Sequence, residues 1–175
     1  MLDRQNNILI IGAGLMGASL ALALKNTNRF KIINAVVKDK TEQQKARKLE
    51  CFNNVFTSIT KKNICAADLI IVATPVSIIP EIINKIYPLT KKECIITDLG
   101  SVKYSILQKI KTEYRYKYVG SHPMTGSEKN GIDFADAALY ENAVVILIKE
   151  KKTDLQRLDI LCEFWKLLKC NVKII

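Results

Sequence analysis

His122 is the only histidine in this chain of 175 residues, and it lies after an apolar segment in the run Tyr118-Val-Gly-Ser-His-Pro-Met-Thr-Gly-Ser127. Since an imidazole changes its charge near neutral pH, histidine is the side chain best suited to general acid–base catalysis. Ser101 follows another apolar segment, in the run Asp98-Leu-Gly-Ser-Val-Lys103. If both segments are strands of one doubly wound sheet, their ends meet at the edge where such sheets bind ligands. We therefore expect Ser101 and His122 to face one crevice as catalytic residues.

Each of these two residues also has a purely structural explanation. Ser101 is placed to serve as the N-cap of a helix expected over residues 102–113, and it could do so while facing a crevice. His122 could instead be an ordinary histidine of a loop, or a buried structural histidine. The sequence leaves these alternatives open.

The spacing of three glycines near the N-terminus predicts a phosphate-binding turn. Gly12, Gly14 and Gly17 match the pattern G-x-G-x-x-G, between a strand expected over residues 8–11 and a helix expected over residues 15–25. In such a turn the first glycine permits the sharp bend, the second lets backbone N–H groups approach a pyrophosphate, and the third lets helix and strand pack closely. The helix N-terminus adds partial positive charge. We therefore expect a dinucleotide site; the alternative is a tight turn that binds nothing.

The residues after the second expected strand bear on the choice of cofactor. An acidic residue at this strand end normally hydrogen-bonds the adenosine ribose. Here the position holds Val37, followed by Lys38, Asp39 and Lys40. With no carboxylate to repel it, the 2′-phosphate of NADP would be tolerated beside Lys38, so the sequence favours NADP. NAD stays open, because a slightly longer strand would let Asp39 act as the ribose acid.

Short apolar runs alternate with helical patterns along the whole chain. Strands are expected over residues 8–11, 31–37, 55–58, 68–75, 94–98, 118–121, 143–148 and 172–175. Helices are expected over residues 15–25, 42–49, 77–87, 102–113 and 153–169, with a short one ending near residue 138. Thr41 and Ser77 are the expected N-caps of the second and third helices. The alternation predicts an α/β fold with a doubly wound, mostly parallel sheet of the Rossmann type, as a single dinucleotide-binding domain over residues 1–175.

The composition excludes several classes of protein. With 49% hydrophobic and 25% charged residues, the chain is typical of a globular protein. No apolar run approaches the roughly 18 residues of a membrane span, and the N-terminus lacks a signal-peptide pattern, so we expect a cytoplasmic protein without a membrane anchor. The five cysteines form no C-x-x-C pair and no metal-ligand spacing. We therefore expect reduced thiols and no metal site.

The formal net charge of +10 raises the question of a polyanionic partner. The lysines are spread over many segments, and no basic stripe interleaved with aromatic residues is present. This distribution argues against nucleic-acid binding and favours attraction for anionic small molecules.

Taken together, four segments of the chain resemble the prephenate dehydrogenase family, also called the arogenate/prephenate dehydrogenases of tyrosine biosynthesis. The segments are Ile10-Ile-Gly-Ala-Gly-Leu-Met-Gly-Ala-Ser-Leu-Ala21, Val72-Ala-Thr-Pro75, Thr97-Asp-Leu-Gly-Ser-Val-Lys103 and Gly120-Ser-His-Pro-Met-Thr-Gly-Ser-Glu128. The glycine turn is shared with many dehydrogenases. The pattern D-x-G-S-V-K followed by G-S-H-P-M-x-G-S-E is much more specific.

The resemblance implies the oxidative decarboxylation of prephenate to 4-hydroxyphenylpyruvate with reduction of NAD or NADP. His122 would hold the C4 hydroxyl of the substrate and take its proton, and Ser101 would hydrogen-bond that hydroxyl or the histidine beside the nicotinamide. Ser127 and Glu128 would line the substrate pocket, with Glu128 gating access through an ion pair. The implied cofactor contacts are Gly12, Gly14, Leu15, Met16, Gly17, Lys38, Thr74, Pro75 and Ser101.

One expected part of the family is missing from this sequence. Members of the family continue into a helical domain that dimerises and supplies arginine and histidine groups to the substrate carboxylates, whereas this sequence ends at Ile175, about where that domain would begin. We expect that domain to be absent, so that a homodimer would need another surface. Three alternatives stay open: an arogenate dehydrogenase, a catalytically incomplete NAD(P)-binding module, and another small-molecule dehydrogenase of the β-hydroxyacid or pyrroline-carboxylate reductase type.

Overall fold

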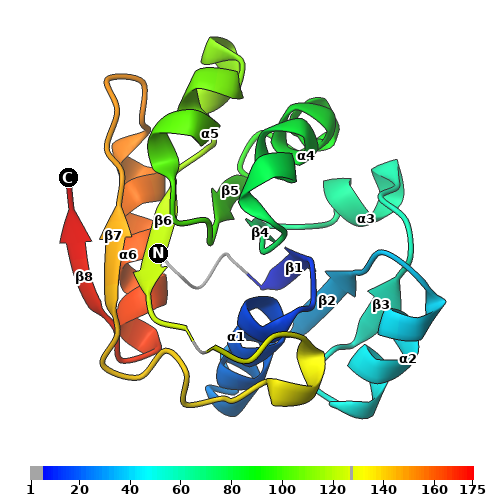
Figure 1. Ribbon diagram of the computed structural model, residues 1–175. Coiled ribbons are helices and arrows are strands. Elements are labelled where there is room, and N and C mark those ends of the chain that lie inside the picture. Colours follow the sequence, from blue (N-terminus) through cyan, green and yellow to red (C-terminus); the bar gives the residue numbers. More distant parts are fainter. Residues whose placement is uncertain (1–5, 127) are drawn as a thin grey trace.

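The computed structural model describes residues 6–126 and 128–175, and its centre is a parallel sheet of five strands in the order β3-β2-β1-β4-β5 (Figure 1). The strands are β1 (Asn7–Ile11), β2 (Ile32–Val36), β3 (Asn54–Phe56), β4 (Leu69–Val72) and β5 (Ile95–Asp98). The chain first builds outward from β1 to β3 and then returns to build β4 and β5 on the other side. The order therefore reverses between β1 and β4, which is where ligands bind in doubly wound sheets.

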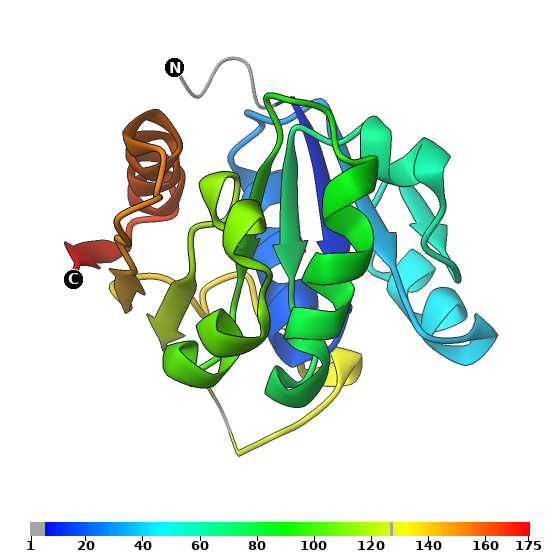
Figure 2. The ribbon, with the colours of Figure 1, turned by 90° about the horizontal axis from the view of Figure 1, so that it is seen from above.

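Helices cover both faces of this sheet (Figure 2). They are α1 (Leu15–Asn26), α2 (Lys40–Lys48), α3 (Lys61–Cys65), α4 (Ile79–Ile86), α5 (Lys103–Lys109) and α6 (Leu155–Leu167), with 3₁₀ turns at Val76–Ile78, Tyr87–Leu89, Thr112–Tyr116 and Ile132–Phe134. In β1, Ile8 and Ile10 pack in the core beneath α1 and α6, whereas Leu9 and Ile11 pack beneath α3, α4 and α5. Burial on both faces explains why β1 is a continuous apolar run.

A second sheet of three strands lies beside the first. It is made of β6 (Ser121–Met124), β7 (Val144–Leu147) and β8 (Asn171–Ile174), with β6 antiparallel and β8 parallel to β7. Tyr118 makes one parallel bridge to Ile96 of β5, so the chain passes along the main sheet before it enters β6. The fold is the expected α/β Rossmann type with a mostly parallel sheet.

The strand expected over residues 118–121 is misplaced. The regular strand begins only at Ser121 and runs through His122 and Pro123, so the histidine lies in β6 and not in a loop. Pro123 caused the error, because proline donates no backbone hydrogen bond and therefore argues against a strand interior. In the three-stranded sheet β6 is an edge strand, where proline is tolerated.

Three expected helix caps are wrong. Asp39, and not Thr41, caps α2, since its carboxylate accepts the Glu42 N–H at 2.8 Å. Ser77 lies inside a 3₁₀ turn, and α4 begins at Ile79.

The third cap concerns a candidate catalytic residue. Ser101 precedes the N-cap position of α5, which Val102 occupies without a side-chain cap. The capping explanation of Ser101 is therefore wrong. The helix is also shorter than the expected range 102–113, because it ends at Lys109 and a 3₁₀ turn follows.

Among the described residues, no helix has both the length and the apolar character needed to cross a bilayer.

Candidate functional site

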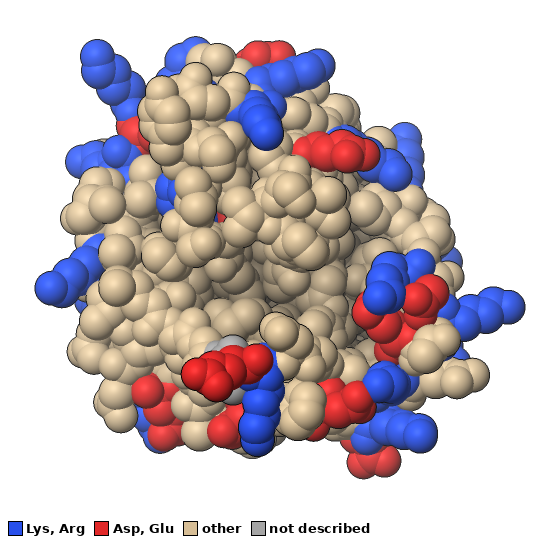
Figure 3. Space-filling view, viewed as in Figure 1, with Lys and Arg blue, Asp and Glu red and all other residues tan. Residues whose placement is uncertain are grey.

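Two adjoining pockets follow the carboxyl ends of the main-sheet strands. The histidine pocket, of about 490 Å³, is lined by Gly14, Leu15, Met16, Ala73, Thr74, Pro75, Val76, Leu99, Gly100, Ser101, His122, Pro123, Thr125, Gly126, Asn130 and Gly131. The β2 pocket, of about 680 Å³, is lined by Ile11, Gly12, Ala13, Gly14, Val36, Val37, Lys38, Glu42, Thr57, Ser58, Ile59, Ala73, Thr74, Pro75, Ile78, Ile82 and Lys85. Because Gly14 and residues 73–75 line both pockets, the pockets form one crevice. Figure 3 shows a hollow in this face that is mostly uncharged, with charged side chains around it.

The glycine turn forms the floor between the two pockets. Gly12 has φ +98°, and a Cβ there would lie 2.6 Å from the Ala73 carbonyl oxygen. A Cβ on Gly17 would lie 2.0 Å from the Gly12 carbonyl oxygen, so only glycine lets α1 pack this closely on the turn. A Cβ on Gly14 would meet nothing within 4 Å, because this residue opens onto the crevice. The three positions thus differ in the way that a phosphate-binding turn requires.

The open side of this turn fits a pyrophosphate. Gly14 is the N-cap residue of α1 and brings no side chain to cap it, so the partial positive charge of the helix N-terminus is open to an anion. Thr74 lines both pockets, and its buried hydroxyl has no hydrogen-bond partner among the described residues. Buried polar atoms are rarely left unpaired, and a bound ligand would give this hydroxyl a partner.

The charged residues of the β2 pocket begin just after β2. Lys38 Nζ lies 3.0 Å from Glu42 Oε1, and both residues line the pocket. The hydrogen bond and charge of Glu42 raise the pKa of Lys38. Asp39 does not line the pocket, and its carboxylate is engaged in capping α2.

Ser101 and His122 meet at the histidine pocket, on the side away from β2. Ser101 comes three residues after the end of β5, and His122 comes from β6, where it is paired with Ile146 of β7. The structure thus brings the two candidate catalytic residues, from two different sheets, to the pocket that continues into the glycine turn.

A buried ion pair that the sequence analysis did not assign lies next to these residues. The Asp98 carboxylate is fully buried and accepts hydrogen bonds from Tyr118 Oη at 2.7 Å and Gly100 N at 2.9 Å. It also pairs with the buried ammonium group of Lys103, whose pKa is lowered by burial although Asp98 raises it. Asp98 and Lys103 are the first and last residues of the D-x-G-S-V-K motif, and this motif is the feature of the sequence that could have pointed to the pair.

The surroundings of His122 favour the neutral form of its imidazole. Partial burial lowers its pKa most, the positive charge of Lys103 lowers it further, and Asp98 acts in the opposite direction. A neutral imidazole can accept a proton, so this lowering of the pKa favours the form that a general base requires.

A second buried network holds β6 against β5. Thr97 Oγ1 and Ser121 Oγ are 2.7 Å apart, and Trp165 Nε1 of α6 donates to Ser121 Oγ at 3.2 Å. All three residues are fully buried. We call this network of Thr97, Ser121 and Trp165 the seam. Since Ser121 directly precedes His122, the seam fixes the start of the strand that carries the imidazole.

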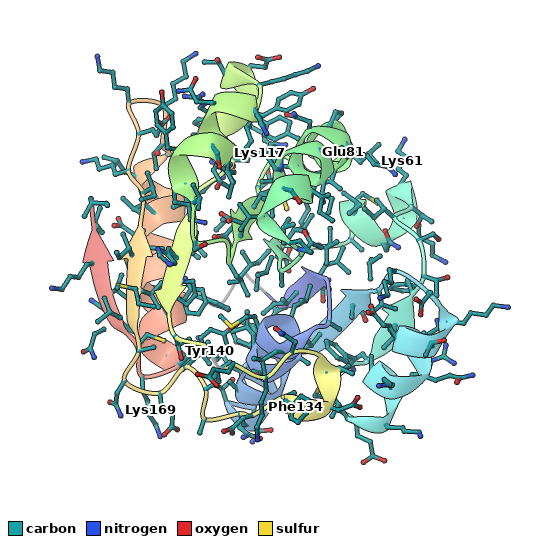
Figure 4. All side chains as sticks on the ribbon, viewed as in Figure 1. Lys61, Glu81, Lys117, Phe134, Tyr140 and Lys169 are labelled. Carbon is teal, nitrogen blue, oxygen red and sulfur yellow. The ribbon has the colours of Figure 1, made fainter. Side chains whose placement is uncertain are left out.

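The segment before β7 is attached to α1. Tyr140 is fully buried, and its hydroxyl donates to the Met16 carbonyl at 2.8 Å, while Ser19 Oγ accepts the Asp136 N–H at 2.9 Å. Figure 4 shows Tyr140 between the second sheet and α1, with Phe134 beside α1. These contacts hold the segment against α1, although none of its residues lines either pocket.

The loop after β6 contains the two expected substrate contacts. Ser127 lies outside the described residues. Glu128 is exposed and is not among the residues that line the histidine pocket, whereas Thr125 and Asn130 of the same loop are. Sequence reasoning did not select these two polar residues, since nothing in their spacing distinguishes them from other loop residues.

The reversed strand order, the glycine turn and the crevice define a nucleotide-binding domain of the Rossmann type. A family model described as "Prephenate dehydrogenase, nucleotide-binding domain" matches residues 20–175. The chain therefore belongs to the prephenate dehydrogenase family.

Named relatives agree with this assignment. A prephenate dehydrogenase of Lactococcus lactis is 35% identical over 151 residues, which are 83% of this chain and 41% of the relative. A cyclohexadienyl dehydrogenase of Zymomonas mobilis is 32% identical over 161 residues, which are 91% of this chain and 55% of the relative. This chain thus spans about half the length of the curated relatives that it matches.

Solved structures give the same result for the fold. The prephenate dehydrogenase of A. aeolicus, in complex with hydroxyphenyl propionate and NAD+, superposes with a TM-score of 0.91 at 30% identity, covering 97% of this chain and 59% of that one. The arogenate dehydrogenase of Synechocystis superposes with a TM-score of 0.88 at 26% identity, again covering 97% of this chain and 59% of that one.

Proposed function

We propose that this chain is the cofactor-binding part of an enzyme that converts prephenate to 4-hydroxyphenylpyruvate by oxidative decarboxylation, with NAD or NADP as hydride acceptor. The observation that carries the proposal is the shared lining of the histidine pocket, in which Ser101 and His122 stand next to the glycine turn. The A. aeolicus structure, which holds NAD+ and a hydroxyphenyl compound, supports the same choice of ligands.

In this proposal each group has a definite task. The glycine turn and the N-terminus of α1 hold the pyrophosphate, with the Thr74 hydroxyl as a further donor. The neutral imidazole of His122 accepts the proton of the substrate hydroxyl at C4, while C4 gives up its hydride. Ser101 orients that hydroxyl by a hydrogen bond. Loss of the C1 carboxylate as carbon dioxide then leaves its bonding electrons in the ring, which becomes aromatic, and the proton held by His122 returns to the C4 oxygen to give the phenol.

The substrate is a dianion, and its carboxylates need cationic partners. Among the described residues that line the histidine pocket, none is a lysine or an arginine. We therefore propose that these cations come from elsewhere in the complete enzyme, as the longer relatives suggest. Association as a homodimer, a cytoplasmic location and the lack of a nucleic-acid partner stay predictions from the sequence.

The test is the substitution His122→Asn. We expect turnover of prephenate, followed by NAD(P)H absorbance, to fall by about 10²–10⁴-fold, because the general base is removed. Affinity for the dinucleotide, measured by calorimetry, should stay within about twofold of the wild type, since the glycine turn is intact. A variant as active as the wild type would refute the catalytic role.

An arogenate dehydrogenase is the second candidate, favoured by the superposition on the Synechocystis enzyme. The two reactions share their chemistry at the ring and differ in the side chain of the substrate. Parallel assays with prephenate and arogenate separate them. Turnover of neither compound, combined with tight dinucleotide binding, would instead identify a catalytically incomplete NAD(P)-binding module.

A further inference from the structure

The lining of the β2 pocket includes three charged residues, and this inference about them rests on the proposed dinucleotide function. They are Lys38, Glu42 and Lys85. In this class of fold the adenosine ribose lies beyond the second strand, so these charges meet either a 2′-hydroxyl or a 2′-phosphate. The question is which of the two they select.

Neither residue first considered for this selection supplies a carboxylate to the pocket. Val37 occupies the usual acidic position and is buried. The carboxylate of Asp39 accepts the Glu42 N–H at 2.8 Å, and the residue is not part of the lining. The carboxylate that does line the pocket belongs to Glu42, one turn further along the chain.

Glu42 is less exposed than the lysine with which it pairs, and both residues line the pocket. Its side chain is 32% exposed, whereas that of Lys38 is 72% exposed. The pair joins Lys38, which precedes the N-cap residue of α2, to Glu42 in the first turn of that helix, with Lys38 Nζ 3.0 Å from Glu42 Oε1. A ligand beside this pair would therefore meet a carboxylate, together with a lysine that is already paired with it.

We propose that Glu42 makes this site select NAD+ over NADP+, in place of the acidic residue that β2 lacks. Its carboxylate can accept hydrogen bonds from the ribose hydroxyls of NAD+, and it repels the 2′-phosphate of NADP+. The phosphate could use Lys38 only by displacing Glu42 from the ion pair. The proposal reverses the preference for NADP that Val37 and Lys38 suggested from the sequence.

The negative charge of Glu42 offsets the positive charges of the two lysines that line the pocket, Lys38 and Lys85. Lys85 lines the same pocket from α4, so without Glu42 the pocket would present two cations and no carboxylate. Such a site attracts a 2′-phosphate. Removal of the Glu42 charge should therefore switch the preference, and not merely weaken binding.

The experiment measures dissociation constants of NAD+ and NADP+ by calorimetry for the wild type and for Glu42→Gln. We expect the wild type to bind NAD+ more tightly, and the variant to shift the ratio of the two constants toward NADP+ by about tenfold or more, as for a doubly charged phosphate close to a carboxylate in a partly aqueous site. Glu141→Gln is the matched control, because it breaks an exposed ion pair with Lys169 and changes the net charge equally. The control should leave the ratio unchanged.

A double variant tests whether the gained affinity for NADP+ depends on Lys38 or comes from a general disturbance of the site. Lys38→Met in the Glu42→Gln background should lose most of the gained affinity for NADP+, since the freed lysine is what the phosphate uses. A wild type that prefers NADP+, or a ratio that Glu42→Gln does not move, overturns the inference while dinucleotide binding still supports the proposed function. If the wild type binds neither cofactor, the proposed function fails and the inference fails with it.

Discussion

At the level of single residues, His122 is distinguished by what surrounds it. The imidazole is partly buried in β6, with the Lys103 ammonium group close enough to disfavour a second positive charge. Both influences favour the neutral form, and Asp98 only partly offsets them. The same surroundings that make the group a base also make its protonation unfavourable for the folded state.

This environment predicts a measurable titration. Because the chain has one histidine, untagged protein gives a single imidazole signal in NMR spectra. We expect its folded-state pKa to lie below the ordinary value of about 6.5, which the urea-unfolded chain should show. The sign follows: the stability contributed by the neutral imidazole is fully present above the unfolded-state pKa and is lost as pH falls through the folded-state pKa. The acid limb of kcat/KM should follow the folded-state value, and a folded-state pKa above the unfolded one would contradict the account.

The chemistry of single residues was predictable where residue type alone was informative. A lone histidine and a serine after apolar runs could be nominated without coordinates, and both line one pocket. The Asp98–Lys103 pair was not nominated, because a sequence does not reveal that a carboxylate and an ammonium group are buried against each other. The Lys38–Glu42 pair was missed for a related reason: the carboxylate reaches the pocket from the next helical turn and not from the strand end.

At the level of elements, the unit formed by β1, the glycine turn and α1 carries the cofactor proposal. Its three glycines are not equivalent, although the motif writes them alike. Gly17 faces the backbone of the turn, whereas Gly14 faces open space. A side chain at Gly17 should therefore reduce the stability of the protein, whereas a side chain at Gly14 should reduce its affinity for the dinucleotide.

Two alanine substitutions test this separation. Gly17→Ala places a Cβ 2.0 Å from the Gly12 carbonyl oxygen, and we expect it to lower the free energy of unfolding by about 1–3 kcal/mol or more. Gly14→Ala has space and an ordinary φ of −71°, so stability should change by less than about 0.5 kcal/mol. Its methyl group would, however, occupy the approach to the pyrophosphate and weaken dinucleotide binding at least tenfold. Urea unfolding and calorimetry measure both, and equal stability losses at the two positions would contradict the assignment.

The elements themselves were predictable where burial on both faces makes a strand continuously apolar, as in β1 and β4. The three-stranded sheet was less accessible. In β6 the sequence His122-Pro123 has the composition of a loop, and only the position of this strand at a sheet edge makes it possible. The cap of α2 failed because Asp39 and Thr41 are both suitable residues and stand two positions apart. The cap of α4 failed because Ser77 lies in a 3₁₀ turn that precedes the helix, and the N-cap position falls on Ile78.

At the level of the whole molecule, the crevice is built by two sheets. The glycine turn and Ser101 follow strands of the five-stranded sheet, and His122 lies in the three-stranded one. The contacts that fix their relative position include the seam of Thr97, Ser121 and Trp165, the bridge at Tyr118 and the bond from Tyr140 to α1. None of the three seam residues lines the histidine pocket.

A double-mutant cycle measures how strongly the seam couples the sheets. Thr97→Val and Ser121→Ala should each lower the free energy of unfolding by about 1–3 kcal/mol, because Thr97→Val removes one of the two partners of Ser121 Oγ, and Ser121→Ala takes this partner from both Thr97 Oγ1 and Trp165 Nε1. The double variant should lose less than the sum, since it removes both hydroxyls of the 2.7 Å contact. Ser105→Ala, which removes an exposed hydroxyl, is the control and should stay within about 0.5 kcal/mol of the wild type. Strict additivity at the seam would show that the two hydroxyls are not coupled.

The seam also determines how a mutational screen of this protein would mislead. Small shifts of β6 would move the imidazole relative to the hydride acceptor, and geometric errors of this kind cost rate steeply. A screen that measures only turnover would then identify Thr97, Ser121 and Trp165 as catalytic residues, although all three are fully buried and none lines the histidine pocket. Mutant libraries of this site should therefore measure the amount of folded protein and the amount of product separately. Otherwise residues that hold the two sheets together will be scored as catalytic residues.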